Sequence, residues 1–291
     1  MGVSFAGTKI AHRSSYQALM ERKAEIADHF RRRSIAQGQD GNFGALFTHH
    51  LRLRNIYAGL CSLIDNPNLS FLLEGATGTG KDRMIQEFVR LENVYRKLLG
   101  LEQARFCKVS EEAREDVLST LLKETPKQNA IFYFTSLESF SLHEQEILSE
   151  LLQLQDCREQ PYRLIFGCQE SLAFMVQRGK ILSDIVQSLQ MYSFSLPRLK
   201  DRNEDFPHLL GDFIHRYTNK RDFVRHEALE KFTKLEYPYN LDSLSGVIRK
   251  ALALNPHPSQ WSAHFIESIY PHSKPERTEK ILDFTPGLRY Q

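Results

Sequence analysis

Residues 70–82 have the sequence SFLLEGATGTGKD, in which an apolar run is followed by a glycine-rich turn and then by a helical pattern. The apolar run at 70–73 predicts a buried strand, and the pattern over 81–99 predicts a helix. Residues 75–82 fit the motif G-x-x-x-x-G-K, with Asp82 in place of the usual Ser or Thr. A strand, a turn and a helix in this order predict a loop that binds phosphate groups.

The chemistry of this loop follows from its residue types. Glycines let backbone N–H groups curl around phosphate oxygens, the helix N-terminus adds a favourable dipole, and a Lys ammonium neutralises phosphate charge. We therefore predict that the loop binds ATP or ADP, and the alternative is a loop that has lost this role. Asp82 either binds magnesium directly or faces solvent. The predicted binding residues are Gly75, Thr77, Gly78, Thr79, Gly80, Lys81 and Asp82.

The pattern around the loop predicts an α/β fold. Further apolar runs at 130–134, 163–167 and 192–196 predict strands, and helices are predicted at 51–64 and 142–154. Strands separated by helices are typical of a mostly parallel sheet flanked by helices. We predict four parts, listed here in chain order: an N-terminal helix (16–33) and linker in 1–45, the α/β domain in 46–200, an all-helical lid in 201–254 and a C-terminal tail in 255–291.

Composition excludes several classes of protein. The chain has 291 residues, with 38 Lys and Arg against 36 Asp and Glu, so a strongly basic coat for nucleic acid is excluded. No apolar run reaches the ~20 residues that span a bilayer, and the N-terminus lacks a signal-peptide core. The four cysteines are scattered and are expected to be reduced. We expect a cytoplasmic protein without a membrane partner.

Five segments, in order, resemble the AAA+ domain of sigma-54-dependent bacterial transcription activators. GATGTGKD at 75–82 resembles that family's G-E-S-G-T-G-K-E, and AIFYFTSLESFSLHEQEILSELLQ at 130–153 resembles its Walker B segment and following helix. RLIFGCQESL at 163–172 resembles the sensor I strand. SLPRLKDRNEDFPHLLGDFI at 195–214 and EYPYNLDSLSGVIRKAL at 236–252 resemble the lid segments. The resemblance implies an AAA+ sheet, P-loop NTPase-like, with a C-terminal helical lid.

The departures from the family fall at its catalytic positions. The aligned positions, in chain order, are Thr135 and Ser136 for the Walker B Asp and Glu, Gln169 for the sensor I Asn, Leu182 and Ser188 for the arginine fingers, and Asp242 for the sensor II Arg. The G-A-F-T-G-A loop that touches the sigma factor has no counterpart between Lys81 and Thr135. Asp82 and Thr135 are the remaining candidates to hold magnesium.

The rate factors expected for the substituted groups affect hydrolysis and leave nucleotide binding aside. An arginine finger contributes roughly 10³–10⁵ in rate, and a positioned base roughly 10²–10⁴. The hypothesis is therefore a nucleotide-binding regulatory protein with impaired hydrolysis, acting through an AAA+ homologue, a sigma factor or another regulator, with its oligomeric state open. One alternative is a nucleotide-free scaffold. The other is a weak ATPase in which Glu138 or Glu144 replaces the lost base.

Three smaller predictions complete the sequence analysis. The pair His49–His50 precedes a helix and either contacts nucleotide or lies on the surface. Lys200 and Arg202 are expected to serve the junction between the α/β domain and the lid. The apolar stripe from Trp261 to Tyr270 is expected to pack onto the lid, and the proline-rich segment 255–291 is not expected to bind DNA sequence-specifically.

Overall fold

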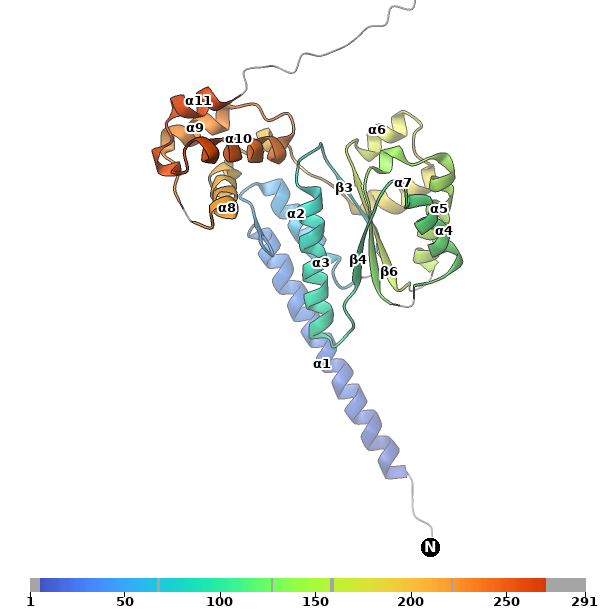
Figure 1. Ribbon diagram of the computed structural model, residues 1–291. Helices are drawn as coiled ribbons and strands as arrows, with labels where there is room; N and C mark the ends of the chain where they lie inside the picture. Colours follow the sequence, from blue (N-terminus) through green and yellow to red (C-terminus); the bar gives the residue numbers. More distant parts are fainter. Residues whose placement is uncertain (1–5, 67–68, 127, 158–159, 221, 271–291) are drawn as a thin grey trace, which may run out of the picture.

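The computed structural model describes residues 6–66, 69–126, 128–157, 160–220 and 222–270, with side chains from residue 20 onward except at 156 and 157. Its centre is a parallel five-stranded sheet in the order β4-β5-β6-β3-β7 (Figure 1). The strands are β3 (Phe71–Glu74), β4 (Arg105–Val109), β5 (Ala130–Phe134), β6 (Tyr162–Cys168) and β7 (Ser193–Ser195). The parallel α/β architecture predicted from the sequence is confirmed.

Helices cover both faces of this sheet. The α/β helices are α2 (Leu51–Ser62), α3 (Lys81–Leu98), α4 (Arg114–Lys123), α5 (Leu142–Cys157), α6 (Leu172–Gln177) and α7 (Ser183–Leu189). Successive strand residues point to opposite faces, so Phe71 and Leu73 of β3 pack with α2 and α3, whereas Leu72 packs with α5 and α7. Two apolar cores therefore lie on either side of one sheet.

Most predicted elements are observed with small shifts at their ends. Strand β5 has the predicted bounds, and β3, β6 and β7 differ from the predicted runs by one residue at each end. Helices α2, α3 and α5 begin at their predicted first residues. Strand β4 is not predicted, because its sequence RFCKV at the edge of the sheet mixes exposed and partly buried side chains and is not a continuous apolar run.

The N-terminal segment differs from its prediction. Helix α1 (Ala6–Gln39) continues past Arg33 into the stretch predicted as a loop, and the short strands β1 (Asn42–Phe43) and β2 (Leu46–Phe47) form an antiparallel hairpin. Helix α1 packs against α2, and its free end points away from the α/β body (Figure 1). A Cβ at Gly38 would lie 2.6 Å from the backbone nitrogen of Ala58, so glycine permits this close approach. Phe43 of the hairpin is buried in the core beside α2.

The lid forms a third apolar core. Its helices are α8 (Phe206–Thr218), α9 (His226–Lys234), α10 (Asn240–Leu254) and α11 (Ala263–Ile269). Trp261 is fully buried there among residues that include Phe232 and Ile266, and its indole nitrogen donates to the Asn255 carbonyl at 2.9 Å. The predicted packing of the Trp261 stripe onto the lid is therefore confirmed. The part of the tail from residue 271 lies outside the described residues.

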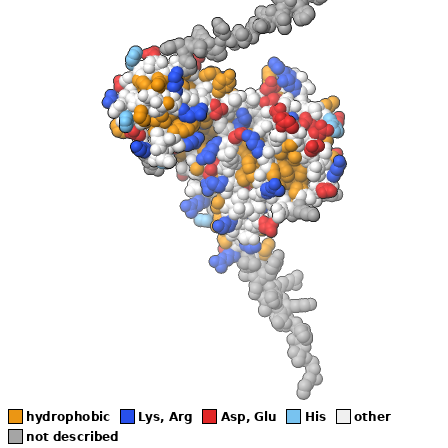
Figure 2. All heavy atoms as spheres, in the orientation of Figure 1, with side chains coloured by type: hydrophobic (Ala, Val, Ile, Leu, Met, Phe, Trp, Pro, Cys, Tyr) orange, Lys and Arg blue, Asp and Glu red, His pale blue; other side chains and the backbone are white. Residues whose placement is uncertain are grey.

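Short 3₁₀ turns connect these elements. They lie at Leu137–Ser139, Gln190–Tyr192, Leu199–Asp201, Asn203–Asp205 and Pro258–Gln260. Within the described part of the chain, no helix is both long enough and apolar enough to cross a bilayer. On the face drawn in Figure 2, acidic and basic side chains are interspersed over the α/β body and the lid.

A buried ion pair joins the sheet to α3. Arg163 of β6 is 1% exposed, and its Nε lies 3.1 Å from Oε2 of the fully buried Glu92. The two Nη atoms of Arg163 donate to the carbonyls of Leu69 and Leu63, at 2.7 and 2.8 Å, so the guanidinium ties β6 to the end of α2. Arg96 also contacts Glu92, at 3.1 Å. Glu92 thus compensates two cations that burial would otherwise penalise.

We predict that Glu92→Gln lowers the free energy of unfolding by about 3 kcal/mol, because Arg163 would be left as a buried cation without its counter-charge. Urea unfolding followed by circular dichroism measures this change. The control is Glu150→Gln, because Glu150 is exposed on α5. The control should stay within about 0.5 kcal/mol of the unaltered chain. An equal small effect of both substitutions would contradict the role given to the ion pair.

Candidate functional site

The loop between β3 and α3 has the backbone of an anion cradle. Gly78 and Gly80 adopt left-handed φ values of 74° and 102°, where glycine is favoured. Gly80 is the N-cap of α3 and provides no side chain to bond the first N–H groups of that helix. These N–H groups and the helix dipole therefore face the space beyond the loop, as an anion site requires.

Lys81 is the first residue of α3, and its ammonium lies against the loop. Nζ donates to the carbonyl of Gly75 and, at 3.3 Å, to that of Ala76. Burial lowers the pKa of Lys81, and the negative field of Glu138 and Asp82 opposes that shift. The cation is thus held within the loop, at the position where the motif places it.

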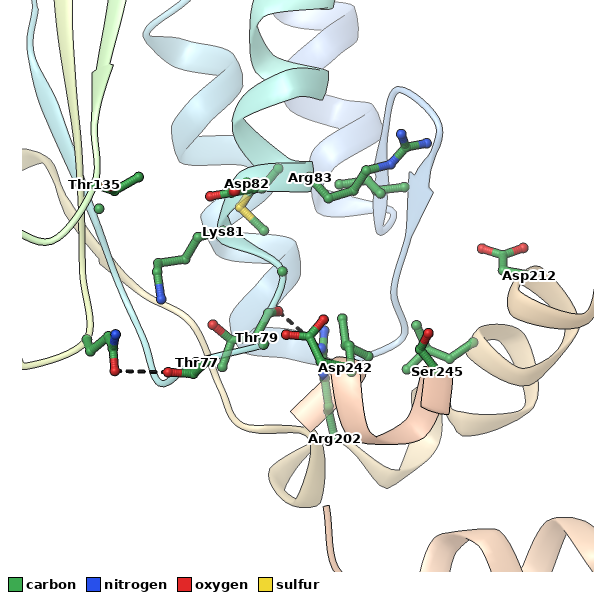
Figure 3. A pocket seen from close by; sticks show the side chains of 18 of the residues that line it. Thr77, Thr79, Lys81, Asp82, Arg83, Thr135, Arg202, Asp212, Asp242 and Ser245 are labelled. Atoms are coloured by element: carbon green, nitrogen blue, oxygen red, sulfur yellow. Dashed lines mark hydrogen bonds between the residues drawn. The ribbon is translucent and has the colours of Figure 1, made fainter. Parts of the chain in front are cut away.

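A cavity of about 510 Å³ opens from this loop toward the lid (Figure 3). The lining includes the loop and the residues that follow β5 and β6, together with the apolar side chains Leu46, Phe47, Leu209, Phe213 and Leu241 and the charged lid side chains Asp212, Arg216 and Asp242. A phosphate cradle in a cavity with an apolar part of its wall suits a ligand with an anionic and an apolar part.

The lid is fastened to the loop by hydrogen bonds. Asn240, which is 4% exposed, donates from Nδ2 to the Thr77 carbonyl at 2.8 Å and accepts at Oδ1 from the Leu199 N–H at 2.9 Å. The N–H of Leu241 donates to the Gly78 carbonyl at 3.0 Å. Arg202 donates to the Thr79 carbonyl at 3.3 Å, and burial lowers its pKa. Arg202 therefore lies at the junction, as predicted.

The carboxylate of Asp82 accepts hydrogen bonds from residues of two neighbouring strands. Its Oδ2 accepts a hydrogen bond from Lys108 of β4, and its Oδ1 accepts one from the hydroxyl of Tyr133 of β5 at 2.8 Å. Burial would raise the pKa of Asp82, but these two hydrogen bonds and the charges of Lys108 and Lys81 leave it lowered. Both carboxylate oxygens are therefore hydrogen-bonded, while 53% of the side chain is exposed, so the prediction that Asp82 faces solvent is consistent with the structure.

The substituted Walker B and sensor I positions line the cavity. Thr135, Ser136 and Gln169 follow β5 and β6 and meet at the carboxyl edge of the sheet. Gln169 accepts at Oε1 from the hydroxyl of Thr77 at 2.9 Å, as Figure 3 shows. Ser136 adopts a left-handed φ of 56°, which is uncommon for a residue with a side chain. Neutral groups thus stand at the edge where the family carries acids.

Glu138 and Glu144, the two residues considered as replacements for the lost catalytic base, have different surroundings. Glu144 accepts from the N–H of Ser141 at 2.7 Å while its own N–H donates to the Ser141 hydroxyl, which is a capping box at the start of α5. Glu138 accepts from the Gln169 N–H at 3.1 Å with Oε1, and its Oε2 is buried without a hydrogen-bond partner in the structure. Glu144 is thus committed to a helix cap, whereas Glu138 lies next to the site.

The remaining predicted positions lie apart from the phosphate loop or on the lid. Leu182 is the N-cap of α7, and Ser188 lies within that helix; neither lines the cavity. Asp242 lies at the cavity on α10, where a Cβ on Gly78 would be 3.0 Å from its Oδ2 (Figure 3). The lid position that carries an Arg in the family therefore presents a carboxylate to the loop.

Of the two interpretations given for His49 and His50, the structure favours the surface pair, with His49 exposed and His50 partly buried. His50 caps α2 through Nδ1, and the His49 N–H donates to Asp205 at 2.7 Å; neither side chain lines the cavity. Leu46 and Phe47, from the adjacent hairpin, line it instead. These two residues, and Lys108, Tyr133 and Asn240, are not among the site residues predicted from the sequence. Of them, Tyr133 and Asn240 had a local signal, since both lie in segments that resemble the family.

The sheet order, the loop and the helical lid together define an AAA+ fold. Comparison with known families agrees, because the family model described as "Sigma-54 interaction domain" matches residues 62–199. The phenol regulator MopR of Acinetobacter guillouiae is 23% identical over 251 residues, which cover 75% of this chain and 43% of MopR. The regulatory protein AtoC of Escherichia coli K12 is 31% identical over 100 residues, or 33% of this chain and 22% of AtoC.

Solved structures support the same fold. NtrX from Brucella abortus in complex with ATP has a TM-score of 0.62 at 16% identity, covering 94% of this chain and 63% of that chain. Its complex with ADP has a TM-score of 0.60, also at 16% identity, covering 93% of this chain and 62% of that chain. The chain is therefore related to the sigma-54-dependent activators through its AAA+ portion. It spans less than half the length of the curated relatives MopR and AtoC.

We predict that Asn240→Ala lowers the free energy of unfolding by about 2 kcal/mol more than Asn219→Ala, because it also leaves the buried N–H of Leu199 and the part-buried carbonyl of Thr77 unpaired. Both asparagines have left-handed φ, at 48° and 55°, so both substitutions carry the same backbone strain. Asn219 is exposed at the end of α8 and is the matched control. Chemical unfolding of both variants measures the difference. Equal losses would show that the Asn240 amide does not fasten the lid.

Proposed function

We propose that this chain binds ATP or ADP between the loop 75–82 and the lid, hydrolyses it poorly, and regulates transcription-related partners by protein contact. The observation that carries the proposal is the cradle itself: left-handed glycines, an uncapped helix N-terminus and Lys81 meet at a cavity of about 510 Å³. The apolar side chains in the lining of that cavity suit an adenine ring. The structural neighbour NtrX was crystallised with ATP and with ADP, which supports the same ligand class here.

Impaired hydrolysis follows from the groups around the cradle. Thr135 and Ser136 carry no carboxylate to polarise an attacking water, and Leu182 and Ser188 carry no guanidinium for a neighbouring subunit. Losing an arginine finger costs roughly 10³–10⁵ in rate, and losing a base roughly 10²–10⁴. Phosphate binding depends instead on backbone N–H groups and Lys81, which this chain retains. Binding and hydrolysis are therefore separable in this fold.

A protein partner is the second part of the proposal. The matched relatives are regulators, and MopR and AtoC carry that description. An AAA+ homologue with intact arginine fingers would suit the cavity side of this chain, while the α7 side offers Leu182 and Ser188 in return. In such a pair, only the cavity of this chain would receive an arginine finger, because this chain offers none in return. A sigma factor or another regulator is the other partner class that the relationship suggests.

A nucleotide-free scaffold is the second candidate function, and the closed junction favours it. Asn240, Leu241 and Arg202 all bond to loop carbonyls, and Asp242 brings a negative charge toward Gly78. A carboxylate in this place opposes bound phosphate. This candidate predicts no gain in stability when nucleotide is added, whereas a ligand that binds only the folded chain must raise the melting temperature.

A weak ATPase is the third candidate, and Glu138 supports it more than Glu144 does. The buried Oε2 of Glu138 has no hydrogen-bond partner, so it is available to accept a proton from water. Steady phosphate release that disappears in both Lys81→Ala and Glu138→Gln would favour this candidate. The proposal above expects release near the background rate for the unaltered chain.

We predict that ATP and ADP bind the unaltered chain and that Lys81→Ala weakens ATP binding about tenfold or more, because a hydrogen bond to a charged group is lost. Isothermal titration calorimetry measures both affinities. Lys97→Ala is the control, since Lys97 is exposed in the last turn of α3. Its affinity should match that of the unaltered chain.

The opposite result has a clear meaning. If the unaltered chain takes up neither nucleotide, and its melting temperature does not change in excess ATP, the scaffold function replaces the proposed one. If Lys81→Ala and Lys97→Ala bind equally well, the nucleotide lies elsewhere than in the loop.

A further inference from the structure

We propose that this site binds nucleotide phosphates without a divalent cation, and that Lys108 takes the bridging position of that cation. The inference rests on the proposed nucleotide binding and adds a residue and an ionic condition to it. The fold family implies magnesium beside the phosphates, but the residues around the cradle do not suit that ion.

The ligand set for magnesium is missing. Magnesium prefers hard oxygen ligands, which are carboxylates in protein sites, together with phosphates and water. Thr135 and Ser136 stand at the Walker B edge and offer only neutral hydroxyl groups. Within the described residues, no cluster of three or more His, Cys, Asp and Glu side chains is arranged to hold a metal. Asp82 is the one acid that the motif itself supplies. Of the other acids near the loop, Glu138 accepts from the Gln169 N–H and Asp242 lies on the lid helix α10.

Both carboxylate oxygens of Asp82 are already bonded. Lys108 donates to Oδ2, and the Tyr133 hydroxyl donates to Oδ1 at 2.8 Å. A magnesium ion would have to displace an ammonium that is bound through a charge-assisted hydrogen bond.

The fold holds this arrangement in place. Lys108 and Tyr133 are paired residues of the adjacent parallel strands β4 and β5. The ammonium lies 5.7 Å from the centre of the Tyr133 ring, within the range of a cation–π contact. A Cβ on Gly167 would lie 2.8 Å from the Tyr133 hydroxyl, so glycine leaves room for the ring. Sheet register and a glycine thus fix the carboxylate and the cation together.

The chemistry of Lys108 suits a bridge. An ammonium has three N–H donors, and Asp82 takes one of them. The side chain is 52% exposed and its ammonium contacts Asp82, which lines the cavity, and we infer from this that it turns toward a phosphate oxygen beside Lys81. A cation that contacts Asp82 and a phosphate at once would supply positive charge beside the phosphates, which is the role that magnesium would otherwise have. Lys108 can fill this role without loss of the Asp82 contact.

ATP titration in excess magnesium and in excess EDTA tests the inference. The unaltered chain should bind ATP with affinities that agree within about threefold in the two conditions, well below the roughly tenfold effect of one lost charged contact. Lys108→Met should weaken binding in EDTA about tenfold or more, and magnesium should restore part of the loss because Asp82 is released. Lys108→Arg should stay close to the unaltered chain, and Lys97→Met is the control for surface charge.

The outcomes distinguish failure of the inference from failure of the proposed function. ATP binding that needs magnesium in the unaltered chain overturns the inference and leaves the proposed function intact. Lys108→Met that binds in EDTA as well as the unaltered chain does also overturns it. Binding of ATP in neither condition removes the proposed function and the inference with it. Melting curves of each variant without nucleotide establish that it is folded.

Discussion

The side-chain amide of Asn240 joins the helical lid to the phosphate loop at the site. It is buried, it bonds to Thr77 in the phosphate loop and to Leu199 at the exit of the sheet, and it opens the lid helix α10. The backbone there is left-handed, which Asn tolerates better than most residues. The cavity lies between the loop and the lid, so its shape depends on this contact.

Under the proposed function, the residues around the loop separate nucleotide binding from nucleotide hydrolysis, which usually occur together. The cradle is made of backbone N–H groups, glycines and one lysine, and all of these are retained. In the proposed function, the groups that would act on the bond between phosphates are side chains, and the positions that the resemblance assigns to them carry Thr135, Ser136, Leu182 and Ser188 instead. Asp242 and the Lys108–Asp82 pair add charges in new places. A phosphate-binding fold with altered chemistry is the coherent interpretation of both sets of changes.

Much of the fold could be predicted from the sequence, because its strongest signals are local. The buried run AIFYF gave β5 with correct bounds, and the glycine-rich motif gave β3, the loop and the start of α3. Edge strand β4 was missed because only a fully buried strand is a continuous apolar run. Helix α1 was predicted to end too early, because packing on α2 overrides the weak helical preference of its last residues.

The site was predictable only where its residues are contiguous. The loop was found from its motif, but Lys108 and Tyr133 reach Asp82 across 26 and 51 residues of chain. Leu46 and Phe47 line the cavity through a hairpin of two-residue strands, which carries almost no periodic pattern. Such contacts depend on the order of strands in the sheet and on the docking of the lid, and neither is written in local sequence.

A single-turnover experiment tests the central claim most directly. The chain is mixed in excess with radiolabelled ATP, and the protein-bound nucleotide is recovered over many hours and separated into ATP and ADP. The account predicts that label stays with the protein and remains ATP. Conversion of the bound label to ADP within minutes, or label that never stays with the protein, would contradict it.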